Sequence, residues 1–399
     1  MKLLFLIQFI LFFAFSSFAS IKPKLIGRTH INKPGYNLPG YSTITNSSPQ
    51  INNSGDILIN LTSTNNSSQP GLWLKRAHDL KGKTIVLGRE NEFFSSPSFN
   101  KDLQIVYHHY TDGDTYGIKK YQFDDDKITS IISLEQLPLT TSFSFPQINL
   151  QNHVLFRSLN NDGKRSIVTV YQEQIKTLLA ENEEIKYIFT PNFNDKGSFA
   201  VKLLIKDLQT HELYSEIKVY DSSGFMRTID STKNKSSKYI DFNNSVYLNS
   251  KDTLLYIGVN NNHRRELILY SKQKKYVIAK EGSDTVSQIE SFLPKVNSKN
   301  DVVFRATNRF GRRTIYAFSN FTLIPLLQEG DKIPCDLDSD CYVTLKEGFP
   351  GISGNLDLND SRHLVGHIVL SNKDMTRYFG EAIYEWNLNF LDKGISFDH

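Results

Sequence analysis

The sequence Pro146-Gln147-Ile148-Asn149 is followed, after a short turn, by the apolar stretch His153-Val154-Leu155-Phe156. The same phrase, an apolar residue and an asparagine often preceded by proline, begins seven similar segments of the 399-residue chain. Its asparagines are Asn52, Asn100, Asn149, Asn194, Asn249, Asn297 and Asn359. They are separated by 48, 49, 45, 55, 48 and 62 residues, which suits a four-stranded propeller blade. The repeat therefore predicts an all-β, seven-bladed β-propeller with four-stranded antiparallel blades.

Aromatic residues support the same architecture. Four copies carry an aromatic seven residues after the asparagine, namely Tyr107, Phe156, Tyr256 and Phe304. A ring at one register is what packing between neighbouring blades requires.

The seventh copy lacks an obvious fourth strand, and two segments compete for that place. Residues Lys24 to Arg28 precede the first copy and have the pattern of a strand without a blade. Pairing them with the last blade closes the ring and leaves less strand edge free, so this is the favoured prediction. The alternative places Phe390 to Phe397 there. Either way, residues 24–399 are expected to form one domain.

The repeated asparagine is interpreted as a turn residue. Its side chain can accept a hydrogen bond from a backbone N–H two residues on, which makes an Asx-turn between the first and second strands. Three residues after it, four copies have Gly55, Asn152, Gly197 or Asn300, the residue types that tolerate a left-handed backbone. The phrase is thus predicted to shape a hairpin rather than to carry chemistry.

These features carry a family resemblance. The N-x-x-G-x-x-x-F pattern resembles tandem repeats of that name in exported bacterial proteins. The stretch Phe156-Arg157-Ser158-Leu159-Asn160-Asn161-Asp162-Gly163-Lys164 resembles TolB-like propeller repeats, although asparagine stands where that class favours aspartate. The resemblance implies a propeller scaffold across residues 24–399 and says little about activity.

The N-terminus and the cysteines predict export. Residues 1–19 have a charged start, an apolar run from Leu3 to Phe15 and the small residues Ser17 and Ala19 of a signal peptide. The apolar run is short for a membrane span, so no span is expected after cleavage, and an uncleaved membrane anchor is the alternative. Cys335 and Cys341 are predicted to form a disulfide in an oxidising periplasmic or extracellular compartment. The net charge of +4 is too small to indicate nucleic-acid binding. The protein is expected to be a monomer.

Basic pairs precede the third strand in three copies. They are Lys164-Arg165, Arg264-Arg265 and Arg312-Arg313, and Arg309 adds to the last. The fifth and sixth copies are neighbours, so their arginines are predicted to form a patch for a protein or another anionic component of the cell envelope. An ordinary solvated rim is the alternative.

The longest connection contains the acidic sequence Cys335-Asp336-Leu337-Asp338-Ser339-Asp340-Cys341. Asp336, Asp338 and Asp340 are candidate Ca²⁺ ligands, but the glycine and the distal glutamate of an EF-hand loop are absent at their spacing. A stapled acidic turn without metal is the preferred interpretation, so no cofactor is expected.

Catalytic motifs are also missing from the sequence. There is no G-x-S-x-G elbow, phosphate loop or dinucleotide fingerprint. The function expected is therefore non-enzymatic binding or scaffolding through one face of the propeller. The alternative is a metal-dependent, lactonase-like hydrolase whose site lies at the propeller mouth, with catalytic residues that the sequence does not identify.

Overall fold

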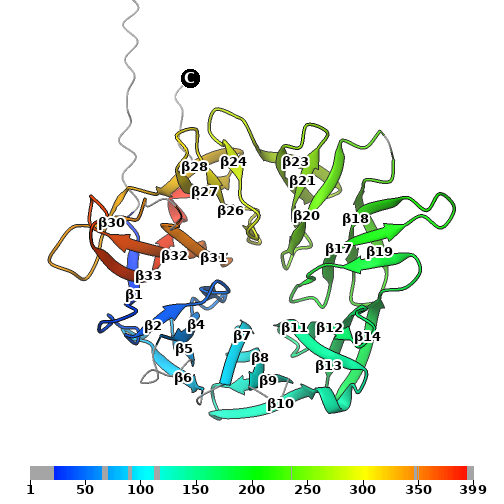
Figure 1. The fold of residues 1–399 in the computed structure, drawn as a ribbon, viewed down its shortest axis with the longest axis horizontal. Coiled ribbons are helices and arrows are strands. Elements are labelled where there is room, and N and C mark those ends of the chain that lie inside the picture. Colours follow the sequence, from blue (N-terminus) through cyan, green and yellow to red (C-terminus); the bar gives the residue numbers. More distant parts are fainter. Residues whose placement is uncertain are drawn as a thin grey trace, which may run out of the picture.

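The computed structural model describes residues 22–64, 71–88, 92–111, 117–234, 236–345, 348 and 350–392. Seven antiparallel sheets are arranged as blades around a central axis (Figure 1). The predicted seven-bladed all-β propeller is therefore confirmed. The predicted signal peptide, residues 1–19, lies outside the described residues.

The first three blades are consecutive in the chain. Blade 1 consists of β2 (Ser42–Ile44), β3 (Gln50–Ile51), β4 (Ile57–Ser63), β5 (Gly71–Lys75) and β6 (Lys83–Leu87). Blade 2 consists of β7 (Glu92–Phe99), β8 (Gln104–Thr111), β9 (Gly117–Gln122) and β10 (Lys127–Ser133), followed by the 3₁₀ helix η1 (Leu134–Gln136). Blade 3 consists of β11 (Thr140–Ile148), β12 (Val154–Asn160), β13 (Arg165–Tyr171) and β14 (Gln174–Ala180).

The next three blades follow the same plan. Blade 4 consists of β15 (Ile185–Ile188), β16 (Asn192–Phe193), β17 (Phe199–Lys206), β18 (Leu213–Tyr220) and β19 (Met226–Ser231). Blade 5 consists of β20 (Tyr239–Leu248), β21 (Leu254–Asn260), β22 (Arg265–Ser271) and β23 (Lys274–Lys280). Blade 6 consists of β24 (Gln288–Ile289), β25 (Lys295–Val296), β26 (Val302–Thr307), β27 (Arg313–Ser319) and β28 (Thr322–Gln328).

Blade 7 is built from both ends of the described chain. It consists of β31 (Ile352–Leu358), β32 (His363–Ser371), β33 (Tyr378–Asn387) and β1 (Lys24–Thr29), with the short strands β29 (Lys332–Ile333) and β30 (Cys341–Val343) added beside β32. Antiparallel pairing of β1 with β33 joins Lys24 to Glu385 and Thr29 to Glu381. The predicted closure by the N-terminal strand is confirmed. The alternative segment begins inside the 3₁₀ helix η2 (Asn389–Asp392), and its residues 393–397 lie outside the described part of the chain.

The inner strand of every blade is interrupted near the middle. In blades 1, 4 and 6 it is divided in two, and in blades 2, 3, 5 and 7 its register shifts at a bulge. Pro97 and Pro146 lie within two of these bulges, where a residue without an N–H donor is tolerated. The proline of the repeated phrase therefore marks where the inner strand bends toward the axis.

The core consists of seven apolar clusters, each between two neighbouring blades. Tyr107, Phe156, Tyr256 and Phe304 are at most 2% exposed and belong to four of these clusters. The predicted packing of these rings between blades is confirmed. Among the described residues, no helix is long and apolar enough to cross a membrane.

Candidate functional site

The seven asparagines form a ring around the axis, on the face that we call the asparagine face. Each lies in the turn between the first and second strands, and its Oδ1 accepts backbone N–H groups as an Asx-turn does. Asn194, for example, accepts from Lys196 and Ser198 at 3.0 Å each. The residue three positions after each asparagine has a positive φ: Gly55, Leu103, Asn152, Gly197, Asp252, Asn300 and Arg362. The predicted hairpin role of the phrase is confirmed.

The same asparagines also link the blades, a role that the sequence does not reveal. In six of the seven, Nδ2 donates to the backbone carbonyl of the asparagine in the next blade. Donor–acceptor distances range from 2.7 Å for Asn249 to Asn297 to 3.4 Å for Asn297 to Asn359. The bond from Asn359 to Asn52, at 3.0 Å, connects the last blade to the first.

The ring is open at one place, between blades 3 and 4. Nδ2 of Asn149 is buried and has no hydrogen-bond partner among the described residues. Gln147 bridges these two blades instead. Its Nε2 donates to the carbonyl of Pro191, and its Oε1 accepts from the N–H of Phe193, both at 2.8 Å.

A channel runs along the axis and is lined by residues of all seven blades, with a volume of about 550 Å³. Its wall includes the residue two positions before each ring asparagine: Gln50, Ser98, Gln147, Asn192, Tyr247, Lys295 and Asp357. These side chains differ from blade to blade, whereas the asparagines do not. Chemical selectivity in the channel therefore depends on this set, which we call the channel ring.

The charged part of the channel ring is an ion pair between blades 6 and 7. Nζ of Lys295 lies 3.1 Å from Oδ1 of Asp357, whose Oδ2 accepts from the N–H of Ile51 at 2.9 Å. Burial lowers the pKa of Lys295, but Asp357 and Tyr247 outweigh it, and the net shift is upward. Burial raises the pKa of Tyr247 to about 12. At neutral pH the ring therefore holds one cation and one anion that compensate each other.

A second set of polar side chains lies on the second strands, eight residues after the ring asparagine, and bonds to the next blade. Asn60 and Arg157 donate to backbone carbonyls of the next blade at 3.0 and 3.3 Å. Lys202 donates to the carbonyl of Phe242, and Arg305 to that of Gly354 at 2.8 Å. Burial lowers the pKa of Arg305 to about 10, against the opposing effect of Glu290 at 3.1 Å. These positions could have been found in the sequence, because each lies eight residues after a repeated asparagine.

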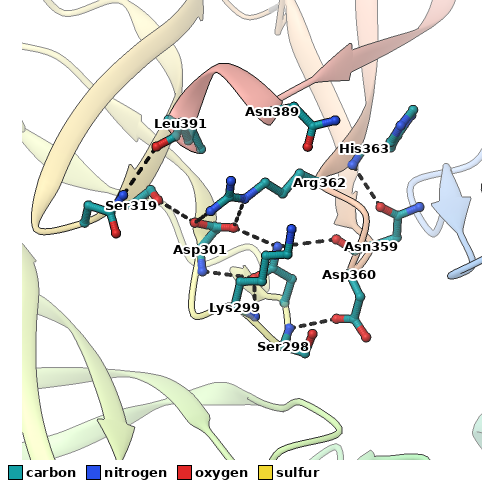
Figure 2. A network of polar contacts seen from close by, with 12 residues as sticks. Ser298, Lys299, Asp301, Ser319, Asn359, Asp360, Arg362, His363, Asn389 and Leu391 are labelled. Atoms are coloured by element: carbon teal, nitrogen blue, oxygen red, sulfur yellow. Dashed lines mark hydrogen bonds and ion pairs between the residues drawn. The ribbon is translucent and has the colours of Figure 1, made fainter. Parts of the chain in front are cut away.

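The turn of blade 7 is fastened to that of blade 6 by a buried ion pair (Figure 2). Nε of Arg362 donates to Asp301 Oδ2 at 2.6 Å, and Nη2 donates to Oδ1 at 3.3 Å. Both side chains are at most 5% exposed. Ser298 adds a backbone N–H to Asp360 at 2.7 Å. This network explains why a residue as large as Arg362 occupies a left-handed position.

The predicted basic pairs lie on the opposite face, in the turns between the second and third strands. The second residue of each pair is an arginine, and it forms an ion pair with the glutamate sixteen residues later in the sequence. Oε2 of that glutamate also accepts a hydrogen bond from the backbone N–H of the arginine. The pairs are Arg165 with Glu181, Arg265 with Glu281, and Arg313 with Glu329. Oε1 of each glutamate accepts an N–H of the next blade at 2.9 Å, so these glutamates also join the blades.

The other predicted basic residues are turned toward solvent to different degrees. Lys164, Arg264 and Arg309 are exposed, whereas Arg312 is half-buried. The guanidinium of Arg309 lies 4.7 Å from the ring centre of Phe310, which is 71% exposed. Lys164 is in blade 3, away from blades 5 and 6. We call Arg264, Arg309, Phe310 and Arg312 the arginine patch.

The acidic loop is closed by the predicted disulfide between Cys335 and Cys341, whose Cα atoms are 6.1 Å apart. It crosses the edge of blade 7: β30 pairs with β32, and the hydroxyl of Tyr384 on β33 donates to the carbonyl of Pro334 at 2.6 Å. Asp336 reaches Arg28 on β1. The loop therefore acts as a strap over three strands of the closing blade.

The strap engages two of the three proposed Ca²⁺ ligands. Asp336 pairs with Arg28 and Asp340 with Lys332, each at 2.7 Å, while Asp338 is exposed. No group of three His, Cys, Asp or Glu side chains suited to a metal ion occurs in the part of the chain that the structure describes. These contacts test neither the preferred metal-free turn nor the alternative of Ca²⁺ binding.

Comparisons with known proteins identify the fold alone. No protein-family model matches the chain, and no curated protein matches it. Among solved structures, the β-propeller domain of the Trilobed protease from Pyrococcus furiosus matches with a TM-score of 0.59 and 11% identity, over 87% of this chain and 95% of that one. That structure is described as having an open velcro topology, whereas β1 closes the ring here.

Two enzymes share the architecture. An oligogalacturonate lyase in complex with manganese matches with a TM-score of 0.57 and 10% identity, over 93% of this chain and 98% of that one. Pyrococcus horikoshii acylaminoacyl peptidase matches with a TM-score of 0.55 and 14% identity, over 86% of this chain but 51% of that one. TolB from Acinetobacter baumannii also matches, with a TM-score of 0.43 and 11% identity over 72% of this chain and 79% of that one. At identities of 10–14% these likenesses show the β-propeller fold and no activity.

Proposed function

We propose that this protein is a non-enzymatic binding protein that presents the arginine patch to an acidic protein surface. The proposal rests mainly on the exposure of the Phe310 side chain beside Arg309. It is 71% exposed at the tip of a turn, with Arg309 packed on its ring. Exposed aromatic residues beside arginine are typical of protein interfaces rather than of solvated rims.

Charge supports the same surface. Glutamates neutralise Arg265 and Arg313, which hold the turns in place. The guanidinium groups of Arg264, Arg309 and Arg312 form no ion pair within the described residues. Arginine binds carboxylates in a bidentate manner, so three such groups on adjacent turns favour an anionic partner.

The disulfide supports export of the protein, because such bonds persist in oxidising compartments. We propose that the protein acts as an exported monomer, in the periplasm or outside the cell, on a partner in the envelope. A metal-dependent hydrolase is the alternative, and no contact among the described residues favours it.

A charge-reversal experiment tests the proposal. The triple variant Arg264→Glu, Arg309→Glu, Arg312→Glu is compared with Lys101→Glu, Lys251→Glu, Lys299→Glu, which changes the charge equally on the asparagine face. Binding to immobilised poly-L-glutamate is measured at several salt concentrations. The arginine variant should lose at least about tenfold in affinity and the lysine variant little. Equal losses would show that only net charge matters, and would remove the patch as the site.

A further inference from the structure

Phe145 is in an unusual conformation inside the axial channel. It lies in the bulge of β11 between Ser144 and Gln147 and has φ of 54°. Its side chain lines the channel and is 39% exposed, although phenylalanine is usually buried. Arg157 lies 5.4 Å from the ring centre. A large apolar side chain is therefore held open to the channel on a left-handed backbone.

The architecture does not require phenylalanine at this position. The inner strand of blade 2 makes the corresponding bulge with Ser96 at φ of 47°, and that of blade 7 with Gly354 at φ of 57°. A small residue therefore suffices to turn the chain. A strained backbone conformation at a large residue, where the turn itself does not require that residue, indicates a functional role.

Amide and hydroxyl groups line the same channel as Phe145. The channel ring contributes Gln50, Ser98, Gln147 and Asn192 to the wall. Gln50 donates to the carbonyl of Pro97, and Asn192 accepts the N–H of Leu248 at 2.7 Å. These bonds orient the carboxamides and use only part of their capacity, because each has two donors and two lone pairs.

The charged side chains of the channel wall are of both signs and largely offset one another. Lys295 and Asp357 compensate each other at 3.1 Å. At the asparagine-face end, Lys101 is opposed by Asp195 and Asp360. Burial first, and then the charge of Asp360, raises the pKa of Asp195. A ligand without charge meets no electrostatic penalty in this channel.

We propose that the channel is a binding site for a neutral oligosaccharide. The apolar C–H face of one sugar ring stacks on Phe145, and its hydroxyl groups bond the carboxamides of Gln50, Gln147 and Asn192. A volume of about 550 Å³ is within the usual range for small-molecule sites. This site is independent of the arginine patch.

Binding is measured by isothermal titration with four neutral tetrasaccharides: cellotetraose, maltotetraose, mannotetraose and N-acetylchitotetraose. Tetragalacturonate serves as the charged counterpart. At least one neutral sugar should bind with a Kd below about 1 mM, and more tightly than tetragalacturonate. Absence of binding by all four at about 10 mM, or tighter binding of tetragalacturonate, overturns the proposal.

A matched pair of variants tests the role of Phe145. Phe145→Ser places the blade 2 residue in blade 3 and should weaken sugar binding about tenfold or more without lowering the Tm. Phe225→Ser, at a 70% exposed position of the outer hairpin of blade 4, should leave binding unchanged. Unchanged affinity in Phe145→Ser overturns the proposal. The arginine-patch variant should still bind the sugar, so the two proposals fail separately.

Discussion

Arg28 and Asp336, which are 308 residues apart in the chain, form a bidentate ion pair across the closing blade, with donor–acceptor distances of 2.9 and 2.7 Å. The two side chains are 8% and 12% exposed. Nη1 of Arg28 also donates to the carbonyl of Phe379 at 2.8 Å. One guanidinium thus joins the first strand, the third strand of blade 7 and the disulfide strap.

Loss of this ion pair should destabilise the ring. Asp336→Ala leaves Arg28 without its carboxylate in a mostly buried place, so the free energy of unfolding should fall by about 2–4 kcal/mol. Asp338→Ala, in the same loop but exposed, is the control and should change stability by less than about 0.5 kcal/mol. Urea denaturation compares the two. Equal stability of both variants would mean that the strap does not secure the closure.

The ring of asparagines contains its own control. Asn249→Asp keeps the Oδ1 acceptor of the turn but places a second carboxylate oxygen against the carbonyl of Asn297, so it should cost about 2–3 kcal/mol. Asn149→Asp makes the same change where Nδ2 has no hydrogen-bond partner within the described residues, and should cost clearly less. Chemical denaturation measures both. A larger loss at Asn149 would contradict the inter-blade role.

The glutamates beside the arginine turns should affect stability and binding in opposite directions. Glu281→Ala removes the acceptor of the N–H groups of Arg265 and Ile289 and should cost about 2 kcal/mol. It also frees the charge of Arg265, so affinity for poly-L-glutamate should rise. Glu183→Ala, at an exposed position in the connection between blades 3 and 4, is the control. A fall in affinity for Glu281→Ala would argue against the arginine patch.

A buried histidine should make the protein sensitive to acid. Burial, and then the charge of His109, lowers the pKa of His108 to about 4. Between the ordinary value near 6.5 and about 4, the unfolded state binds the proton and the folded state does not. Stability therefore falls as the pH falls through this range, by roughly 3 kcal/mol in total from this group.

The residue at the corresponding position of blade 1 provides the test. His108→Asn places there the amide that Asn60 supplies in blade 1. The difference in unfolding free energy between pH 7 and pH 4 should be smaller in this variant than in the wild type, as followed by thermal and urea unfolding. An identical pH dependence would assign the acid sensitivity to other groups.

The number of blades and the disulfide could be predicted because both depend on local sequence patterns. The closing strand could be predicted because its pairing with the last blade leaves the least strand edge unpaired. Glycine and asparagine at the left-handed turn positions were also predictable from residue type. Leu103 and Arg362 were not, because tertiary packing and the ion pair with Asp301 hold them in that conformation.

Hydrogen bonds between blades were the part that the sequence did not reveal. The turn role of Asn249 follows from its own segment, but its bond to Asn297 requires the arrangement of two neighbouring segments. The arginine–glutamate pairs left a signal, since Glu181, Glu281 and Glu329 each follow their arginine by sixteen residues. The role of Phe145 had no such signal, because its backbone conformation appears only in the folded strand.

The pairing of β1 with β33 also sets an order of events during folding. Arg28 and its partner Phe379 are 351 residues apart, so β1 lacks its partner strand in the sheet until the six intervening blades and β33 have been made. Pairings of such long sequence separation form late and slowly. Until then, β1 and the apolar edge of β33 are exposed to other chains, and the ring stays open. A cell that makes this protein would therefore need to protect two distant strands at once, and truncation near either end should yield the same unclosed, association-prone intermediate.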